Sequence, residues 1–214
     1  MAFPDPLEFG ADWTQAEAVV ILMHRGGGSA EEMRDLAARI DSRNVRYILP
    51  GVEGGHWFPK SFLAPLEENE PRLSESLAHF GALIDQIVAR GIALERIVPG
   101  GFSQGACLTA EFLARRPRAY GGALILTGGM IDASAIGRRP GSGLLAVPVY
   151  VSASENDDQV PIDRIRGTIR TLQAGGALIR SHIFADRPHV ICDEEIVEIG
   201  RLLEQVKQAA TPIE

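Results

Sequence analysis

Short runs of apolar residues alternate with amphipathic segments along nearly the whole chain. Each run is apolar at both odd and even positions, as strands are when helices cover a parallel sheet on both faces. The runs occupy 18–23, 45–49, 97–102, 123–126, 147–151 and 178–184. This alternation predicts an α/β fold with a mostly parallel, doubly wound sheet and helices on both faces.

The segments between the runs repeat apolar residues every three or four positions, which is the period of one helix face. Ser29 and Glu32 form a capping box that opens a helix ending near Ile40. A second helix runs from about Leu73 to Gly91, where glycine favours a helix end. Further helices are expected over 106–116, 162–172 and 194–206.

The length and charge of the chain limit its class. A chain of 214 residues can bury a sizeable core, and no linker or repeat divides it, so we expect a single domain over 1–214. The net charge of −7 argues against nucleic acid as a partner, because nucleic acid calls for a basic face. No signal-peptide pattern and no apolar run of membrane-spanning length is present, so we expect no stable membrane insertion and a cytoplasmic location.

The chain has two cysteines, Cys107 and Cys192. We expect both to be reduced, mostly buried thiols rather than a disulfide. No cluster of cysteine and histidine has the spacing of a zinc site, so no metal ligands are predicted.

The pentapeptide from Gly101 to Gly105 reads Gly-Phe-Ser-Gln-Gly and lies where a predicted strand ends and a predicted helix begins. A serine on such a sharp turn holds its hydroxyl exposed, and the flanking glycines let the backbone make the turn. The pattern therefore marks Ser103 as a candidate nucleophile.

Polar residues follow several of the predicted strands, and ligands bind at the carboxyl ends of strands in an open α/β sheet. A glycine-rich turn at 24–28 follows the first run, Ser103 the third, an acidic stretch at 155–158 the fifth, and His189 the sixth. A nucleophile, an acid and a histidine are thus expected at one sheet edge, in the chain order of α/β-hydrolases.

Each of these groups has a role in acyl transfer. Ser103 needs a base to take its proton as it attacks, and His189 can be that base. An acidic residue at 155–158 would hold the imidazole tautomer and stabilise the imidazolium. The developing oxyanion needs preformed N–H donors, for which we expect the backbone N–H of Gln104 and a second one from the glycine-rich turn, Gly26.

At these positions the chain resembles the phospholipase/carboxylesterase family of small α/β-hydrolases, which includes the acyl-protein thioesterases. The pentapeptide around Ser103 matches the family's nucleophile motif letter for letter. Asp157, with Val160 and Pro161 behind it, matches the family's Asp-x-x-Val-Pro and singles out Asp157 rather than Asp158 as the acid. The turn that begins Met23-His24 resembles the family's oxyanion turn, and the residues after His189 resemble the family's short stretch into the last helix.

The resemblance implies an α/β-hydrolase fold without a large cap domain. It also implies carboxylesterase, lysophospholipase-like or thioesterase activity, no metal or organic cofactor, and a homodimer. One position departs from the pattern: the family has glycine directly after the turn's histidine, and this chain has Arg25. A positive φ there would cost an arginine about 1 kcal/mol or more, so Gly26 is the expected oxyanion donor and Arg25 the alternative.

A long segment at 50–71 is rich in glycine, proline and aromatic residues. Long loops in compact domains are usually functional or disordered, and the aromatic content argues against disorder here. We expect this segment to roof the site, with His56, Trp57 and Phe58 binding substrate. A hydrophobic cluster beneath the loop is the alternative for Trp57 and Phe58. Met130, which follows the fourth run, is a further candidate for substrate binding.

These observations predict a serine carboxylesterase that uses Ser103, Asp157 and His189 on small or single-acyl-chain esters. Its partner would be a small-molecule ester. The alternatives are an acyl thioesterase or lysophospholipase with the same triad, and a hydrolase-fold protein that binds a ligand without catalysis. Lactonases resembling dienelactone hydrolase fit less well, because they carry cysteine at the position of Ser103.

Overall fold

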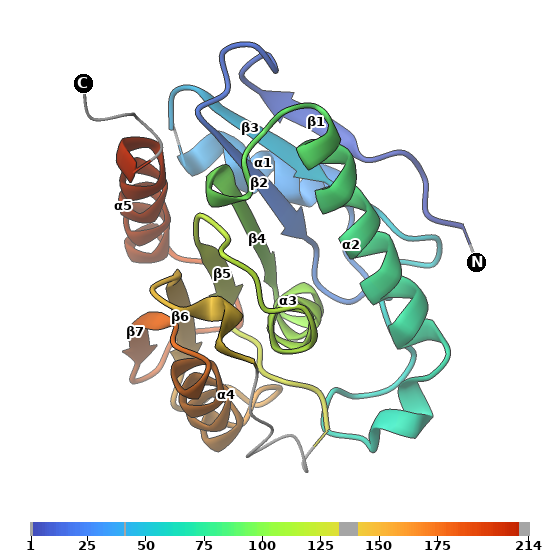
Figure 1. Ribbon diagram of the computed structural model, residues 1–214. Helices are drawn as coiled ribbons and strands as arrows, with labels where there is room; N and C mark the ends of the chain where they lie inside the picture. Colours follow the sequence, from blue (N-terminus) through green and yellow to red (C-terminus); the bar gives the residue numbers. More distant parts are fainter. Residues whose placement is uncertain (1, 41, 133–140, 210–214) are drawn as a thin grey trace.

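A single twisted sheet of seven strands forms the centre of the computed structural model, which describes residues 2–40, 42–132 and 141–209 (Figure 1). The strand order is β1-β3-β2-β4-β5-β6-β7. All neighbours pair in parallel except β1, which is antiparallel to β3. The strands are β1 (Leu7–Gly10), β2 (Ala18–Met23), β3 (Val45–Leu49), β4 (Ile97–Phe102), β5 (Ala123–Leu126), β6 (Pro148–Ser154) and β7 (Leu178–Phe184).

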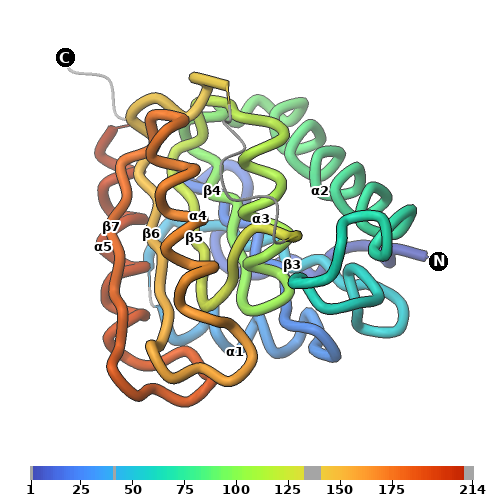
Figure 2. The backbone as a smooth tube through the Cα atoms, turned by 90° about the horizontal axis from the view of Figure 1, so that it is seen from below, coloured from blue at the N-terminus to red at the C-terminus, as the bar shows by residue number. Residues whose placement is uncertain are grey.

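Helices cover both faces of the sheet, as the alternation of apolar runs and amphipathic segments predicts (Figure 2). The helices are α1 (Ala30–Ile40), α2 (Arg72–Ala89), α3 (Gln104–Arg115), α4 (Ile162–Ala174) and α5 (Asp193–Ala209). One hydrophobic cluster joins α2, α3 and α4 to one face, and a second joins α1 and α5 to the other. The sheet is thus doubly wound, and the predicted fold class is confirmed.

Strand β2 shows why the apolar runs are continuous. Val19 and Ile21 belong to the cluster under α2, α3 and α4, whereas Val20 and Leu22 belong to the cluster under α1 and α5. All four side chains are fully buried. Successive residues of a strand point to opposite faces, so a strand covered on both sides must be apolar at every position.

The two edge strands depart from this pattern. Strand β7 was expected to be buried on both faces, but it is the last strand of the sheet, and Leu178 is 61% exposed and Arg180 is also exposed. Strand β1 is not predicted by the sequence. It has four residues of alternating burial and pairs Leu7 with Leu49 of β3.

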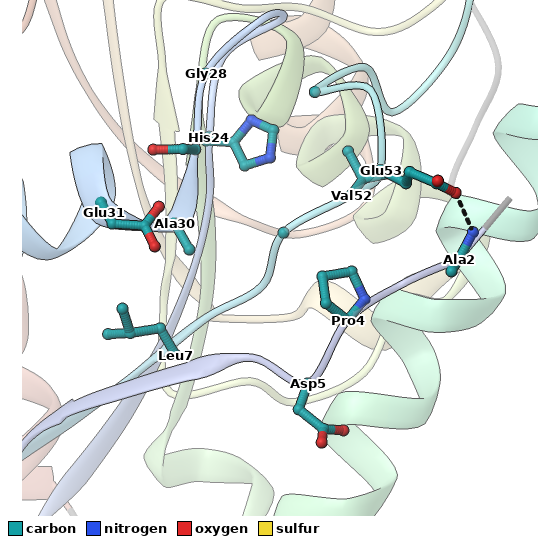
Figure 3. A pocket seen from close by; sticks show the side chains of 13 residues that line it. Ala2, Pro4, Asp5, Leu7, His24, Gly28, Ala30, Glu31, Val52 and Glu53 are labelled. Carbon is teal, nitrogen blue, oxygen red and sulfur yellow. Dashed lines mark hydrogen bonds between the residues drawn. The ribbon is translucent and has the colours of Figure 1, made fainter.

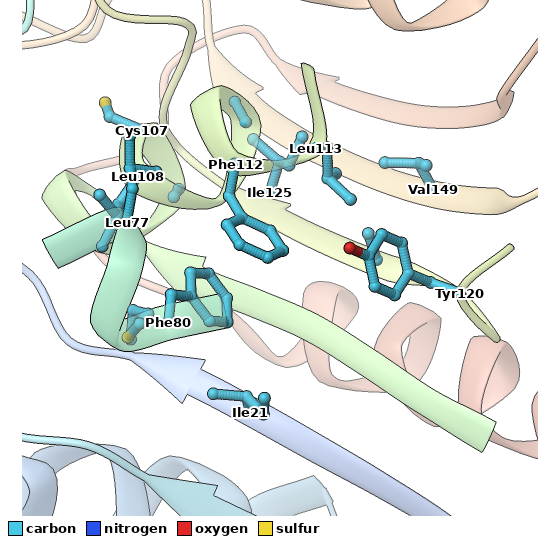
Figure 4. Close-up of a cluster of buried hydrophobic side chains, with 14 of the residues drawn as sticks. Ile21, Leu77, Phe80, Cys107, Leu108, Phe112, Leu113, Tyr120, Ile125 and Val149 are labelled. Atoms are coloured by element: carbon cyan, nitrogen blue, oxygen red, sulfur yellow. The ribbon is translucent and has the colours of Figure 1, made fainter. Parts of the chain in front are cut away.

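Stacked aromatic rings fix α3 beneath the sheet (Figure 4). The rings of Phe80 in α2 and Phe112 in α3 lie 4.6 Å apart between centroids, and Tyr120 lies 6.3 Å from Phe112. Both phenylalanines are at most 1% exposed. Such pairs add about 0.5–1.5 kcal/mol beyond the burial of their area. The packing matters for function because α3 begins directly after Ser103.

The segment from 50 to 71 is packed rather than loose. It contains a short 3-10 helix, η1 (Leu66–Asn69), and its side chains Trp57, Phe58 and Phe62 join the core under α2 and α3. Asn69 is fully buried, accepts the N–H of Lys60 at 2.9 Å and donates to the carbonyl of Ser61 at 3.2 Å.

Within the described ranges, no helix is both long enough and apolar enough to cross a bilayer.

Candidate active site

Ser103 occupies a strained turn between β4 and α3. Its backbone has φ 54° and ψ −116°, in a region that L-residues rarely adopt and that costs on the order of 1–3 kcal/mol. Two hydrogen bonds hold the turn: the N–H of Ser103 donates to the carbonyl of Leu126 at 2.9 Å, and the carbonyl of Ser103 accepts the N–H of Cys107 at 2.9 Å. The side chain therefore stands out at the carboxyl end of the sheet.

The glycines on either side of Ser103 are required by close backbone contacts. A Cβ atom at Gly101 would overlap the backbone carbonyl of Gly105. A Cβ atom at Gly105 would overlap the carbonyls of Met23 and His24 at the end of β2. The Gly-x-Ser-x-Gly pattern thus reflects how tightly α3 packs onto its own strand and onto the neighbouring strand.

His189 links Ser103 to Asp157 through two short hydrogen bonds. The Nε2 atom of His189 lies 2.8 Å from the Ser103 Oγ, and its Nδ1 atom lies 2.8 Å from the Asp157 Oδ2. Because a carboxylate only accepts, Nδ1 carries the hydrogen, and Nε2 is left to accept the Ser103 hydroxyl proton. The structure therefore brings together the three residues that the sequence predicts.

Asp157 is held by more than the imidazole. Its side chain is fully buried, and its Oδ1 accepts the N–H groups of Gln159 and Val160 at 2.9 and 3.0 Å. Burial raises the pKa of Asp157, but the hydrogen bonds from His189 and from these backbone groups outweigh it, so the pKa lies below its usual range. Asp158 is exposed and Glu155 forms an ion pair with Arg166, so the geometry favours Asp157.

A buried ion pair braces the loop that carries His189. Arg187 and Glu195 face each other at 3.2 Å, with side chains that are 5% and 0% exposed. Arg187 also donates to the Thr127 hydroxyl after β5 at 2.6 Å, and its backbone N–H donates to the Ser154 hydroxyl at the end of β6 at 2.9 Å. Arg187 thus ties together two strand ends, the His189 loop and the start of α5. The sequence analysis assigned no role to Arg187.

The glycine-rich turn after β2 lies against the start of α3. A Cβ atom at Gly26 would stand 3.5 Å from the side-chain amide of Gln104. The positive φ of the turn falls on Gly27, at 70°, and Arg25 is not among the described residues with positive φ. The conformational cost expected for Arg25 therefore does not arise. Its side chain instead forms an exposed ion pair with Glu32 at 3.1 Å.

His24 fixes the orientation of one peptide unit in this turn. Its Nδ1–H donates to the carbonyl of Arg25 at 2.7 Å. That carbonyl and the N–H of Gly26 belong to the same trans peptide, so they point in opposite directions. Holding the carbonyl end thus also sets the direction of the Gly26 N–H. Burial lowers the pKa of His24, which keeps the ring neutral near pH 7.

The side chain of Gln104 clamps the segment that begins at 56. Its Oε1 accepts the N–H of Trp57 at 2.8 Å, and its Nε2 donates to the carbonyl of Phe58 at 2.8 Å. The indole N–H of Trp57 in turn donates to the carbonyl of His24 at 2.8 Å. Gln104 therefore connects the residue after the serine to the loop and, through Trp57, to the turn after β2.

The comparison with known proteins agrees with this geometry. The sequence profile of the phospholipase/carboxylesterase family matches residues 10–207. The chain belongs to this family. The fold is accordingly the α/β-hydrolase fold, and the protein is a serine hydrolase acting on ester bonds.

Some relatives of this chain are described as carboxylesterases and others as acyl-protein thioesterases. A probable carboxylesterase, SOBER1-like, of Arabidopsis thaliana is 24% identical, covering 92% of this chain and 82% of the relative. Acyl-protein thioesterase 1 of Gibberella zeae is 27% identical, covering 92% of this chain and 94% of the relative. A crystal structure of a phospholipase/carboxylesterase from Dyadobacter fermentans has a TM-score of 0.85 and 31% identity, covering 95% of this chain and 98% of that one.

A cavity of about 220 Å³ opens beside Ser103. One wall comes from the clamped loop and the other from the stretch after Asp157. The lining residues are Phe58, Lys60, Ser61, Phe62, Ser103, Gln104, Cys107, Gln159 and Val160. The sequence analysis did not predict that Lys60, Ser61, Gln159 and Val160 line the site, because only the fold shows that these two loops face each other across the serine.

The four residues predicted to bind substrate differ in their burial and in whether they line the cavity. Phe58 lines the cavity beside Ser103, and His56 is exposed next to Gly26. Trp57 is fully buried beneath the loop, because its indole N–H reaches the His24 carbonyl, so its assignment to the substrate wall is wrong. Met130 is 2% exposed, belongs to the core cluster under α2, α3 and α4, and does not line the cavity, so its assignment is also wrong.

Cys107 and Cys192 are free thiols, as predicted. Burial raises the pKa of Cys107 to about 12. A thiol with so high a pKa is not a nucleophile near neutral pH. In the part of the chain that the structure describes, no three His, Cys, Asp or Glu side chains gather in a way that could hold a metal ion.

Proposed function

We propose that this member of the phospholipase/carboxylesterase family is a serine carboxylesterase that hydrolyses small or single-acyl-chain esters through an acyl-Ser103 intermediate. The observation that carries the proposal is the pair of 2.8 Å hydrogen bonds that joins Ser103 to His189 and His189 to Asp157. The strained turn at Ser103 and the cavity beside it support the same assignment.

In the first half of the reaction, His189 Nε2 takes the hydroxyl proton as the Ser103 Oγ attacks the ester carbonyl. The carbonyl oxygen becomes an oxyanion, which we assign to the backbone N–H groups of Gln104 and Gly26. The imidazolium is stabilised by the ionised Asp157 and gives its proton to the departing alkoxide. The products of this half are a free alcohol and an acyl ester on Ser103.

In the second half, the neutral imidazole of His189 takes a proton from water as the water oxygen attacks the acyl carbonyl. The tetrahedral intermediate collapses, Ser103 leaves with the proton from the imidazolium, and the carboxylic acid is released. No metal or organic cofactor takes part in either half. His24 and Arg187 touch no reacting atom in this scheme and act by positioning.

The size of the cavity supports a restricted substrate class. About 220 Å³ beside Ser103, lined by the apolar side chains of Phe58, Phe62 and Val160 together with polar groups, suits a short acyl group or one acyl chain.

Thioester hydrolysis is the second candidate. A relative 27% identical to this chain is an acyl-protein thioesterase, and attack on a thioester carbonyl uses the same nucleophile, base and oxyanion donors. Esters and thioesters that carry the same acyl group should therefore be compared in parallel, because kcat/KM then reports the leaving group alone.

The proposal is tested by labelling with a fluorophosphonate and locating the adduct by mass spectrometry. We expect one adduct, on the peptide that contains Ser103, and none on the Ser103→Ala variant. A series of p-nitrophenyl esters from acetyl to hexadecanoyl then defines the acyl preference. A folded protein that neither labels at Ser103 nor turns over any ester or thioester of the series would be a ligand-binding hydrolase fold instead. The homodimer and the cytoplasmic location stay predictions.

A further inference from the structure

A second cavity, of about 520 Å³, lies beside the turn that follows β2 (Figure 3). Its walls come from the N-terminal segment at 2–7, from the turn and first residues of α1 at 28–31, and from the segment at 51–55. Ser103 and Gln104 do not line it, and the proposed reaction uses no group that faces it apart from the positioning residue His24.

One ring nitrogen of His24 faces this cavity (Figure 3). His24 is 1% exposed, its imidazole points into the cavity toward Val52, and its Nδ1–H is committed to the Arg25 carbonyl (Figure 3). The neutral ring therefore presents the lone pair of Nε2. No residue in the described ranges donates a hydrogen bond to this atom. A ligand in the cavity that donates an N–H or O–H can form a hydrogen bond with this atom.

The charge around the cavity is of one sign. Asp5, Glu31 and Glu53 line it, and no lysine or arginine does. Hydrogen bonds from its own backbone N–H and from the Ser29 hydroxyl lower the pKa of Glu31, so its carboxylate stays ionised near neutral pH. The field at this cavity therefore favours a cation and disfavours a carboxylate or phosphate.

The remaining walls are apolar. Pro4, Leu7 and Val52 also line the cavity. A bare metal ion would gain nothing from such walls, and the described residues form no group of three that could coordinate one. The combination calls for a ligand with an apolar body, a positive charge and at least one hydrogen to donate.

We propose that this cavity binds a primary organic ammonium ion on a short apolar chain, with one N–H donated to His24 Nε2 and the charge facing Glu31. The proposal does not depend on the proposed function, because binding is measured without turnover. The His24 ring also connects the ligand to the glycine-rich turn. It accepts a hydrogen bond from the ammonium ion at Nε2 and donates one to the Arg25 carbonyl from Nδ1.

The first test is calorimetric titration of the full chain with hexylammonium chloride, in parallel with hexyltrimethylammonium chloride. We expect saturable binding of one hexylammonium per chain. The trimethylated ion keeps the charge and the apolar chain but has no N–H, so it should bind about fivefold more weakly, the equivalent of one hydrogen bond. Equal affinity for the two ions, or no saturable binding of hexylammonium, would overturn the proposal.

Three variants locate the site. Glu31→Gln should weaken hexylammonium about threefold, as expected for one exposed charge pair. Glu67→Gln, a change at an exposed carboxylate outside the cavity, should leave the affinity unchanged. Gly51→Leu should abolish binding, because Gly51 lines the cavity and a Cβ atom there meets only Pro4, at 3.6 Å, so the backbone tolerates a side chain that fills the space. An equal loss in Glu31→Gln and Glu67→Gln would show non-specific attraction and contradict the proposal.

A second measurement reads His24 directly and does not depend on variants that fold. The nitrogen chemical shifts of the histidine imidazoles report which nitrogens carry hydrogen. On addition of hexylammonium, the Nε2 resonance of His24 should move from that of a free lone pair toward that of a hydrogen-bond acceptor, while Nδ1 stays protonated. If calorimetry shows saturable binding of hexylammonium but the Nε2 resonance of His24 does not change, the ligand binds elsewhere and the proposed site is refuted.

Discussion

The two sides of Ser103 are held in place by different forces. On the side of the glycine-rich turn, the contacts are neutral: backbone hydrogen bonds, the amide of Gln104, the uncharged ring of His24 and the close approach of Gly105 to β2. On the side of the base, the contacts are charged: ionised Asp157 under the imidazole, and the buried pair formed by Arg187 with its carboxylate partner in α5.

This difference follows from what each side must do. In the proposed mechanism, the oxyanion donors need fixed directions, and backbone geometry supplies these at any pH. In the same mechanism, His189 becomes positively charged, so its surroundings must include an ionised carboxylate. The neutral side should therefore be sensitive to changes of volume, and the charged side to changes of charge. Variants on each side test this difference between sensitivity to volume and sensitivity to charge, and the largest effect is expected for Asp157.

Asp157→Asn should lower kcat by about 10⁴-fold, because an amide favours the wrong imidazole tautomer and cannot stabilise the imidazolium. Asp158→Asn is the matched control and should leave kcat nearly unchanged, since Asp158 is exposed. Steady-state kinetics on a p-nitrophenyl ester measures both. The reverse pattern would move the acid by one position and contradict the geometry described above.

Arg187→Met should lower the free energy of unfolding by about 3–5 kcal/mol, because it leaves Glu195 charged and unpaired in the interior. Chemical denaturation measures the loss. The double variant Arg187→Met/Glu195→Leu should lose less than the sum of the single variants. Arg39→Met is the control. Arg39 pairs with Asp193, which lies in α5 as Glu195 does, and the two side chains are 46% and 95% exposed. This pair should contribute less than about 1 kcal/mol to the free energy of unfolding. Additive losses in the double variant would show that Arg187 acts mainly through Thr127.

Gly105→Ala should lower the free energy of unfolding by about 3 kcal/mol, because the added methyl group overlaps the end of β2. Gly200→Ala in α5 adds the same methyl group where nothing lies within 4 Å, and it should stabilise the protein by about 0.5–1 kcal/mol. Denaturation midpoints of the two variants give the comparison. Equal destabilisation would mean that the neutral side is not defined by close packing.

Gln104→Ala should lower kcat/KM about tenfold and the free energy of unfolding by about 1–3 kcal/mol, because the backbone groups of Trp57 and Phe58 lose their partners. The backbone N–H at 104 remains, so fluorophosphonate labelling of Ser103 should persist. A loss of kcat larger than about a thousandfold would imply that the side chain, and not only the backbone, acts on the reacting atoms.

The smallest effect is expected in the pH dependence of stability. The pKa of Asp157 is depressed in the folded protein, so its ionisation stabilises the fold above its ordinary pKa of about 4, and this contribution is lost as the pH falls through the folded value. The difference in Tm between the wild type and Asp157→Asn should therefore shrink as the pH is lowered below about 4. A difference that stays constant over this range would show that Asp157 is not ionised in the folded protein.

Much of the fold was predictable because burial on both faces leaves a local pattern. The run at 18–23 coincides with β2, and the helix expected over 106–116 overlaps α3, which begins two residues earlier and ends one residue earlier. Strand β1 was missed because it has only four residues of alternating burial and pairs at a sheet edge. The exposure of β7 was also missed, since a strand's own sequence does not say whether it lies inside the sheet or at its edge.

The candidate site divides in the same way. The chemical type and chain position of Ser103, Asp157 and His189 could be predicted, because parallel strands bring their carboxyl ends to one edge. The directions of Trp57 and Met130 could not, because an aromatic or apolar side chain in a loop satisfies the same pattern whether it faces substrate or the core.

The sequence by itself determined most of the sheet, the sharp turn at Ser103 and the chain order of Ser103, Asp157 and His189, because each was predicted from short local patterns. Only the tertiary structure decided what holds them: the Arg187 bond to Thr127 spans 60 residues, and the Gln104 bonds to the loop span 46 and 47. It also showed that Arg25 avoids a positive φ, and that His24 turns one nitrogen to the peptide of Gly26 and the other to an open cavity. Contacts of this kind depend on how elements distant in sequence pack, and no local pattern records them.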